Sequence, residues 1–309
     1  MGKSINYQLT GFKALQIEKV RKKLEATLQE KIVSMENIPY GKVNLSYHVV
    51  TNSKDLFCKF SPVWYKHSLE RETWALKTIK GNGGIVPNVV CYIKDGFNYR
   101  GHELLVLEYI SGSLLSNIEN KNKLYKKIFE TYNILHSIAM PGWGWLDRKF
   151  KGQHQKWQEF LYDVENIDSY GHISLEWKMR AEYVIKNLKN IKPSTETARL
   201  LYGDYNDNNF IVTEAGDVCS LDFQNCFAGD PLYDIGIIVS KSDEVFNYLK
   251  YLDYFSENKI KVIYLYALRH ILSMLAFYIN SYDDDKIEAL SKRFLYLRNA
   301  YEGNRLNIS

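Results

Sequence analysis

The stretch that decides the fold is YGDYNDNN at Tyr202–Asn209. Two short apolar runs follow it, Phe210–Val212 and Val218–Leu221, and Asp222 comes directly after the second run. Polar, turn-forming residues separate the two runs, and this pattern predicts a β-hairpin. Because a hairpin folds the chain back on itself, we expect a residue at its entrance and a residue at its exit to lie side by side.

Three oxygen-bearing side chains belong to this stretch. Asn209 stands at the hairpin entrance, Asp222 at its exit, and Asp204 lies one loop away. Mg²⁺ prefers oxygen ligands and usually binds one or two carboxylates together with substrate phosphates. A carboxylate that is not a ligand can orient and deprotonate an attacking hydroxyl, which is the role expected of Asp204. Each residue alone is typical of a turn, but the compound pattern favours a magnesium site beside a catalytic base.

Over nearly its whole length the chain resembles the aminoglycoside phosphotransferase and choline kinase family, relatives of the protein kinases. The family's H-G-D-x-x-x-x-N signature is present as Tyr202–Asn209, with Tyr202 in place of the usual histidine, and its metal-binding aspartate as Asp222. The G-D-P-x-x-D-x-G stretch is Gly229–Gly236. The resemblance implies that Asp234 is buried and braces the catalytic loop. A carboxylate beside a helix N-terminal dipole is the other interpretation, and both can hold for one residue.

The resemblance also implies a phosphate-binding lysine. Lys59 lies on a predicted strand between apolar neighbours, and it would hold the α- and β-phosphates of the nucleotide while Glu72 pairs with it from the following helix. Glu70 is the competing partner. Taken alone, a strand lysine and a helix glutamate are commonplace, so these roles depend on the resemblance.

Two further segments would contact the nucleotide if the resemblance holds. Gly41–Ser46 occupies the place of the loop that covers the phosphates, which would bring in Asn44 and Ser46, although it is not a glycine-rich G-x-G-x-x-G motif. The backbone groups of Glu108 and Ile110 would receive the adenine edge where a strand ends. An edge strand running into a turn is the alternative.

The rest of the chain changes from strand-like to helical periodicity near residue 110. Strands are predicted at Leu45–Val50, Leu56–Phe60, Val89–Ile93 and Glu103–Ile110. Helices are predicted at about 17–28, 68–79, 121–137, 155–164, 175–188, 243–255, 259–279 and 285–301. The hairpin is the one β island expected in the helical half. This order predicts two lobes that meet near residue 110. Together with the resemblance, it implies a bilobal α+β, protein-kinase-like fold, with a five-stranded nucleotide-binding lobe at 1–110, a mainly helical catalytic lobe at 111–309, and ATP or GTP in the cleft between them.

Composition narrows the class of partner. The 309 residues are 46% hydrophobic and carry a net charge of +4, without a basic block of the kind that binds nucleic acid. The four cysteines have no paired spacing, which favours reduced thiols in the cytoplasm. The apolar segment 262–279 has Arg269 and His270 at its centre, so a buried core helix is expected rather than a membrane span.

We therefore expect a small-molecule kinase that uses Mg²⁺ and ATP or GTP and phosphorylates a hydroxyl group. The first acceptor class is an aminoglycoside or related antibiotic. A metabolic kinase of a sugar, amino alcohol or homoserine-like acceptor is the alternative, and an inactive nucleotide-binding regulatory module is a second alternative. A strongly acidic acceptor pocket would favour the first class and a mixed one the metabolic kinase.

Two groups of residues could contact an acceptor but carry no firm assignment. Trp143 and Trp145 flank Gly144 and could stack on a sugar ring, although packing into the core is the expectation. Acidic residues on the C-terminal helices could bind amino groups, but such residues usually form solvated helix faces. They are Glu159, Asp163, Glu165, Asp243, Glu244 and Asp253.

Overall fold

The computed structural model describes residues 17–38, 43–61, 65, 67–94, 103–164, 173–251, 255–281 and 283–306. Within them the chain forms two compact units. The sheet unit comprises the described parts of 17–134 and 206–226, and the helical unit those of 135–205 and 227–306. A lobe boundary near residue 110 stays a prediction. Gly41, Lys42 and the turn expected at Asp95–Gly96 lie outside the described residues.

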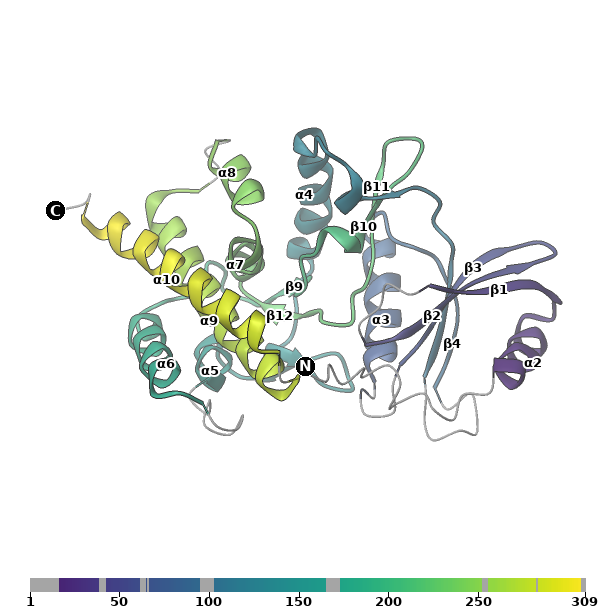
Figure 1. Ribbon diagram of the computed structural model, residues 1–309, viewed down its shortest axis with the longest axis horizontal. Helices are drawn as coiled ribbons and strands as arrows, with labels where there is room; N and C mark the ends of the chain where they lie inside the picture. The colour runs from purple at the N-terminus through teal and green to yellow at the C-terminus, as the bar shows by residue number, and fades with distance from the viewer. Residues whose placement is uncertain are drawn as a thin grey trace. The chain divides into compact units, whose positions relative to one another are not determined.

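The sheet unit is built on a five-stranded antiparallel sheet (Figure 1). Its strands, in spatial order, are β1 (Ile32–Ile38), β2 (Leu45–Thr51), β3 (Asp55–Phe60), β5 (Leu104–Glu108) and β4 (Val89–Ile93). Its helices are α2 (Ile17–Leu28), α3 (Ser68–Gly81) and most of α4 (Asn122–Ser137). The predicted strand count is confirmed, and so is the mixed α and β class, but β1 is a strand that sequence periodicity did not locate.

The central strand β3 supplies the core of this sheet. Its burial pattern places Leu56, Cys58 and Phe60 against α2, whose Val20 and Leu24 are fully buried. Alternation with period two should leave the intervening residues on the opposite face. Lys59 lies on that face and is nevertheless only 5% exposed, so its ammonium group needs partners within the protein.

A second, three-stranded sheet completes the sheet unit. Its strand order is β11 (Val218–Ser220), β10 (Phe210–Val212) and β6 (Ser113–Leu114). Phe210 pairs with Ser220 in the antiparallel register, which confirms the predicted hairpin. The 3₁₀ turns η1 (Leu115–Asn117) and η3 (Asp207–Asn209) precede α4 and β10, respectively. The chain therefore enters the hairpin through a single tight turn.

The helical unit contains a β-sheet that sequence reasoning did not expect. Four short strands form a sheet in the order β8 (Gly152–His154), β7 (Trp143–Leu146), β12 (Phe227–Gly229) and β9 (Arg199–Leu201). The prediction of a single β island in the helical half was therefore wrong. The helices are α5 (Trp157–Tyr162), α6 (Leu175–Leu188), α7 (Pro231–Lys241), α8 (Asp243–Tyr251), α9 (Glu257–Ser281) and α10 (Asp284–Leu306).

Helix α9 packs against α7 and α10 in this unit. It is the one described helix long and apolar enough to cross a membrane, and 56% of its apolar window is buried inside the protein. Arg269 at its centre is 3% exposed and donates hydrogen bonds to the Phe160 carbonyl and the Tyr233 hydroxyl. These contacts satisfy a buried charge, and they agree with the prediction of a core helix.

Candidate functional site

Lys59 gathers two carboxylates inside the sheet unit. Its Nζ lies 3.0 Å from Glu72 Oε2 and 2.8 Å from Asp222 Oδ1. Helix α3 presents Glu72 because Leu69, Glu72, Leu76 and Ile79 follow helical spacing on its buried face. Glu70 instead contacts His67 at 2.9 Å and Lys94 at 3.5 Å. Of the two candidate partners, Glu72 is therefore the one that the structure brings to Lys59.

Burial sets the electrostatics of this cluster. The Glu72 side chain is 2% exposed and that of Lys59 is 7% exposed. Burial raises the pKa of the Glu72 carboxyl to about 7, against the attraction of Lys59. Burial alone would lower the pKa of the Lys59 ammonium, but Asp222 and Glu72 together raise it above its ordinary value. The two acidic partners thus favour the charged form of Lys59.

The β10–β11 hairpin brings Asn209 and Asp222 to the same end of the ladder. The Leu221 amide donates to the Asn209 carbonyl at 2.8 Å, and Asp222 is the next residue. Asp222 has a φ of 57°, a left-handed conformation uncommon for a non-glycine residue, which turns the chain at the hairpin exit. Its side chain is 37% exposed, the most accessible of the Lys59 cluster. An amide and an accessible carboxylate are oxygen donors of the kind that Mg²⁺ accepts.

The expected phosphate-covering residues are buried. Asn44 is 6% exposed and Ser46 5%. The Asn44 amide donates to Gln224 Oε1 at 2.6 Å, and Gln224 Nε2 donates to the Ser68 hydroxyl at 3.1 Å. Ser46 pairs with Lys59 in the register of β2 and β3. The Asn44 side chain thus has a partner within the sheet unit, and the role of Asn44 and Ser46 in covering phosphates stays a prediction.

The end of β5 has the geometry of a strand that stops at Glu108. The Glu108 carboxylate accepts hydrogen bonds from the backbone and side-chain nitrogens of Asn88, at 2.8 and 2.6 Å. The next amide, that of Tyr109, donates to the Asp55 carbonyl at 3.0 Å. Ile110 follows as part of an irregular, partly exposed segment. Binding of an adenine edge by the backbones of Glu108 and Ile110 stays a prediction.

Asp204 and Asp234 belong to the helical unit. Asp234, in the first turn of α7, is 1% exposed and accepts the backbone N–H groups of Tyr202 and Gly203 at 2.9 and 3.0 Å. Gly203 has a φ of 81°, a conformation that favours glycine. The carboxylate thus lies near the start of a helix and also fixes the backbone just before Asp204. Tyr202 itself is buried where the family signature has histidine.

Two residues that contact Asp234 or Asp204 were missed by sequence reasoning. His136 Nε2 lies 2.9 Å from Asp234 Oδ2. Lys241 Nζ donates to Asp204 Oδ1 at 2.8 Å and to the Tyr205 carbonyl at 2.9 Å. No motif singled out either residue, because a basic residue in the last turn of a helix is common on dipole grounds alone.

The family model described as the phosphotransferase enzyme family matches residues 34–256. The chain belongs to the phosphotransferase enzyme family. It is therefore a small-molecule phosphotransferase that acts on hydroxyl groups, and its protein-kinase-like fold is confirmed. A search of curated proteins found no significant match.

Solved structures agree with this phosphotransferase fold. The aminoglycoside phosphotransferase APH(4)-Ia, in a ternary complex with ADP and hygromycin B, has a TM-score of 0.75 at 12% identity, covering 90% of this chain and 97% of that one. The GDP complex of wild-type aminoglycoside 2'-phosphotransferase-IIIa has a TM-score of 0.68 at 14% identity, covering 93% and 99%. A candidate fructosamine-3-kinase from Haemophilus somnus 129PT has a TM-score of 0.66 at 18% identity, covering 94% and 99%.

Three of the acidic residues considered for acceptor binding in this phosphotransferase already have partners within the protein. Asp243 receives two hydrogen bonds from Arg293, at 2.7 and 2.8 Å. Asp163 lies 3.4 Å from His154, and Glu159 accepts the N–H groups at the start of α5. Glu165 and Asp253 lie outside the described residues. Asp243, Asp163 and Glu159 thus each have a partner within the protein.

The Trp143–Trp145 segment is strand β7, and its two tryptophans differ. Trp143 packs 5.7 Å from Trp157, centroid to centroid. Trp145 lies 5.1 Å from Phe227 and keeps 39% of its surface exposed. Core packing therefore describes Trp143 better than Trp145.

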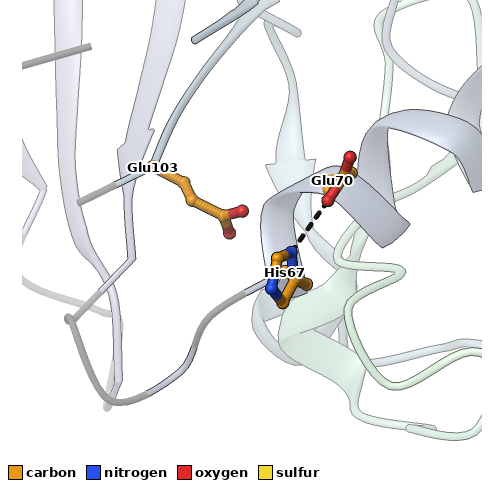
Figure 2. Close-up of side chains that lie close together, drawn as sticks. All are labelled: His67, Glu70 and Glu103. Atoms are coloured by element: carbon orange, nitrogen blue, oxygen red, sulfur yellow. Dashed lines mark hydrogen bonds and ion pairs between the residues drawn. The ribbon is translucent and has the colours of Figure 1, made fainter. Parts of the chain in front are cut away.

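Figure 2 shows a separate group of potential metal ligands in the sheet unit, formed by His67, Glu70 and Glu103. Hydrogen bonds within the protein explain why these three side chains lie close together. Glu103 accepts from the Leu69 amide at 3.1 Å and the Tyr92 hydroxyl at 2.7 Å, and His67 contacts Glu70. The group therefore ties the start of α3 to β5 and β4.

Proposed function

We propose that this phosphotransferase transfers the γ-phosphoryl group of ATP or GTP to an acceptor hydroxyl in a Mg²⁺-dependent reaction. The observation that carries the proposal is the contact of Lys59 with both Glu72 and Asp222 inside one compact unit. A buried lysine oriented by a helix glutamate is a preorganised phosphate ligand. Complexes of the related folds with ADP and with GDP support a nucleotide donor. Asn44, Ser46 and the backbones of Glu108 and Ile110 are proposed to contact that nucleotide.

Asn209 and Asp222 are the residues proposed to hold Mg²⁺. They fit the ion because both offer oxygen atoms, and because Asp222 is the accessible carboxylate of the Lys59 cluster. Bound there, the ion would neutralise phosphate charge. Lys59 would bind the α- and β-phosphates, and Asp204 would orient the acceptor hydroxyl and take its proton. Positioning and electrostatics would supply most of the rate acceleration.

For the acceptor we propose an aminoglycoside or related antibiotic as the first class to test. APH(4)-Ia, which shares the fold, was solved with hygromycin B. A sugar, amino alcohol or homoserine-like acceptor is the second candidate. It is favoured by a specific observation, because the proposed base Asp204 is paired with Lys241 and Asp243 is paired with Arg293. These pairs make the charge near the base mixed rather than strongly acidic. A cytoplasmic location stays a prediction.

The deciding experiment is a coupled assay of nucleoside diphosphate release, run with ATP and with GTP. Aminoglycosides, sugars, amino alcohols and homoserine are supplied as acceptors, with and without Mg²⁺. We expect acceptor-dependent turnover that needs Mg²⁺ and that falls about 10²- to 10⁴-fold in Asp204→Ala. Asp285→Ala, which removes an exposed carboxylate in the first turn of α10, is the matched control and should retain wild-type turnover.

The acceptor that stimulates turnover names the substrate class. Stimulation by sugars or amino alcohols but by no aminoglycoside would replace the first candidate with the second. Nucleotide binding without turnover for every acceptor would contradict the proposal and favour the inactive regulatory module.

A further inference from the structure

Helix α7 holds the catalytic segment at two points. Near its start, Asp234 accepts the backbone N–H groups of Tyr202 and Gly203. Its last residue, Lys241, contacts Asp204 Oδ1 at 2.8 Å and the Tyr205 carbonyl at 2.9 Å. Lys241 is seven positions after Asp234 in the sequence, which is about two helical turns and places both on one face. The helix therefore fixes the backbone before Asp204 and also its carboxylate.

The cation suits its place in the helix. Lys241 lies in the last turn of α7, where the helix dipole favours positive charge. Its side chain is 28% exposed and that of Asp204 is 29% exposed, so water reaches the pair. Ion pairs of this kind contribute little to folding stability, because screening and lost rotamer entropy offset the attraction. Stability is thus a poor explanation for two directed contacts from one ammonium group.

Other titratable groups of the helical unit lie around this pair on α9. Burial, with contributions from Asp283 and Asp204, raises the pKa of Tyr278. Burial, with contributions from Lys241 and Arg269, lowers the pKa of His270 well below its ordinary value. His270 is thus neutral near pH 7, and Lys241 is the cation that contacts the carboxylate of Asp204.

We propose that Lys241 is a positioning residue for the transfer reaction: it holds Asp204 by Oδ1 so that the carboxylate meets the acceptor hydroxyl in one orientation. This inference rests on the proposed role of Asp204. The terminal torsion of an aspartate is broad and roughly two-fold, so a contact from Lys241 to Oδ1 restricts the orientation of the carboxylate. The contact of Lys241 with the Tyr205 carbonyl anchors the ammonium itself, which makes the tether rigid at both ends.

The chemical step leaves Lys241 unchanged. The acceptor oxygen forms a bond to the γ-phosphorus, and the bond from that phosphorus to the bridging oxygen breaks, with its electron pair staying on the nucleoside diphosphate. The hydroxyl proton passes to Asp204. Lys241 keeps its proton throughout and acts only through Asp204. Its loss should therefore slow transfer to the acceptor and leave nucleotide binding intact.

The test compares Lys241→Met with Lys241→Arg. Met keeps the length of the side chain but removes the charge, and we expect kcat for acceptor phosphorylation to fall about 10- to 100-fold, as for misplaced reacting groups. The KM for nucleotide and the Tm should match wild type. Arg can donate to both oxygens that Lys241 contacts and should restore most of kcat. Acceptor-independent hydrolysis of the nucleotide should fall less than transfer, because water needs no oriented acceptor.

The matched control is Lys292→Met, which removes a lysine from an exposed ion pair with Glu288 at 2.7 Å in the same unit. It should leave kcat unchanged. A Lys241→Met variant with kcat within twofold of wild type would overturn the inference. A fall in kcat that comes with a lowered Tm would also overturn it, because the variant would then be destabilised. If wild-type protein phosphorylates no acceptor, the proposed function fails first and removes the basis for this role.

Discussion

Two lysines of this phosphotransferase contact proposed functional carboxylates in opposite environments. In the sheet unit, Lys59 is 7% exposed and contacts Glu72, which is 2% exposed, as well as Asp222. In the helical unit, Lys241 and Asp204 are both more than a quarter exposed and form an ion pair. The same chemistry is therefore buried in one unit and solvated in the other.

The difference in burial determines how a substitution of each lysine affects stability. Removing one partner of a buried pair leaves an uncompensated charge in a poorly solvated place. Removing one partner of an exposed pair costs little, because water solvates the charge that is left. We therefore expect substitutions at Lys59 to affect both folding and nucleotide binding, and substitutions at Lys241 to affect turnover alone.

The largest effect is expected for Lys59→Met. Glu72 would lose its cation while staying buried, and the free energy of unfolding should fall by about 3–5 kcal/mol. Urea denaturation followed by circular dichroism measures this change. Nucleotide binding, measured by calorimetry at a temperature where the variant is folded, should also weaken.

The double variant Lys59→Met/Glu72→Leu sharpens this prediction, because it removes both buried charges. We expect it to recover part of the lost stability without recovering nucleotide binding. If Lys59→Met alone costs less than about 1 kcal/mol, the value typical of exposed pairs, the contrast between the two lysines does not hold.

A smaller effect is expected for Asp234→Asn at the buried end of α7. Asp234 accepts two backbone N–H groups, one with each carboxylate oxygen. Asparagine has only one acceptor oxygen, so one buried N–H would lose its partner at a cost of about 1–3 kcal/mol. Thermal unfolding measures the loss, and kcat should fall with it because the backbone before Asp204 is no longer fixed.

Asp285→Asn, at an exposed position in the same unit, serves as the control. The informative comparison is with Lys241→Met, which occupies the exposed end of the same helix. Asp234→Asn should lower both Tm and kcat, whereas Lys241→Met should lower kcat alone. Identical behaviour of the two variants would mean that α7 acts on Asp204 through stability only.

Sequence reasoning located the elements whose residues carry their own local signal. The β10–β11 hairpin has apolar runs on either side of a turn, and predicted helices such as α4, α6 and α8 have clear apolar periodicity. Strand β1 was missed because most of its residues are partly or fully exposed. The sheet that contains β7, β8, β9 and β12 was missed because each strand has only three or four residues, and because β12 pairs with strands that are distant in the chain.

The candidate site shows the same division. Asp204, Asn209 and Asp222 form a compound pattern in one stretch, so a magnesium site beside a catalytic base could be predicted from their spacing, and the hairpin brings Asn209 and Asp222 to the same end of its ladder. Lys241 and His136 come from helix ends and reach the catalytic segment only through the fold. No spacing rule distinguishes them from other basic residues in the last turn of a helix.

The smallest effect is expected for Glu30→Gln. It tests, through the pH dependence of stability, the contrast between a carboxyl that pairs with an exposed lysine and the buried Glu72. Glu30 accepts hydrogen bonds from Lys54, Thr51 and Ser53, at 2.7, 2.6 and 2.9 Å. These bonds, led by that from Lys54, lower the pKa of Glu30 from 4.5 to about 2. A carboxyl with a lowered pKa stabilises the folded state above its unfolded pKa and loses that contribution as pH falls toward its folded pKa.

The opposite sign applies to Glu72, because burial raises its pKa to about 7. Its protonated form favours folding below pH 4.5, and that contribution is lost as pH rises toward 7. The stability gap between wild type and Glu30→Gln should therefore be constant from pH 7 to about pH 5 and should shrink steadily toward pH 3. Urea midpoints across this range measure the gap, with Glu18→Gln on the exposed first turn of α2 as the control. A gap that widens on acidification would contradict this prediction. It would show that the pKa of Glu30, the partner of Lys54, is raised by folding like that of Glu72, the buried partner of Lys59.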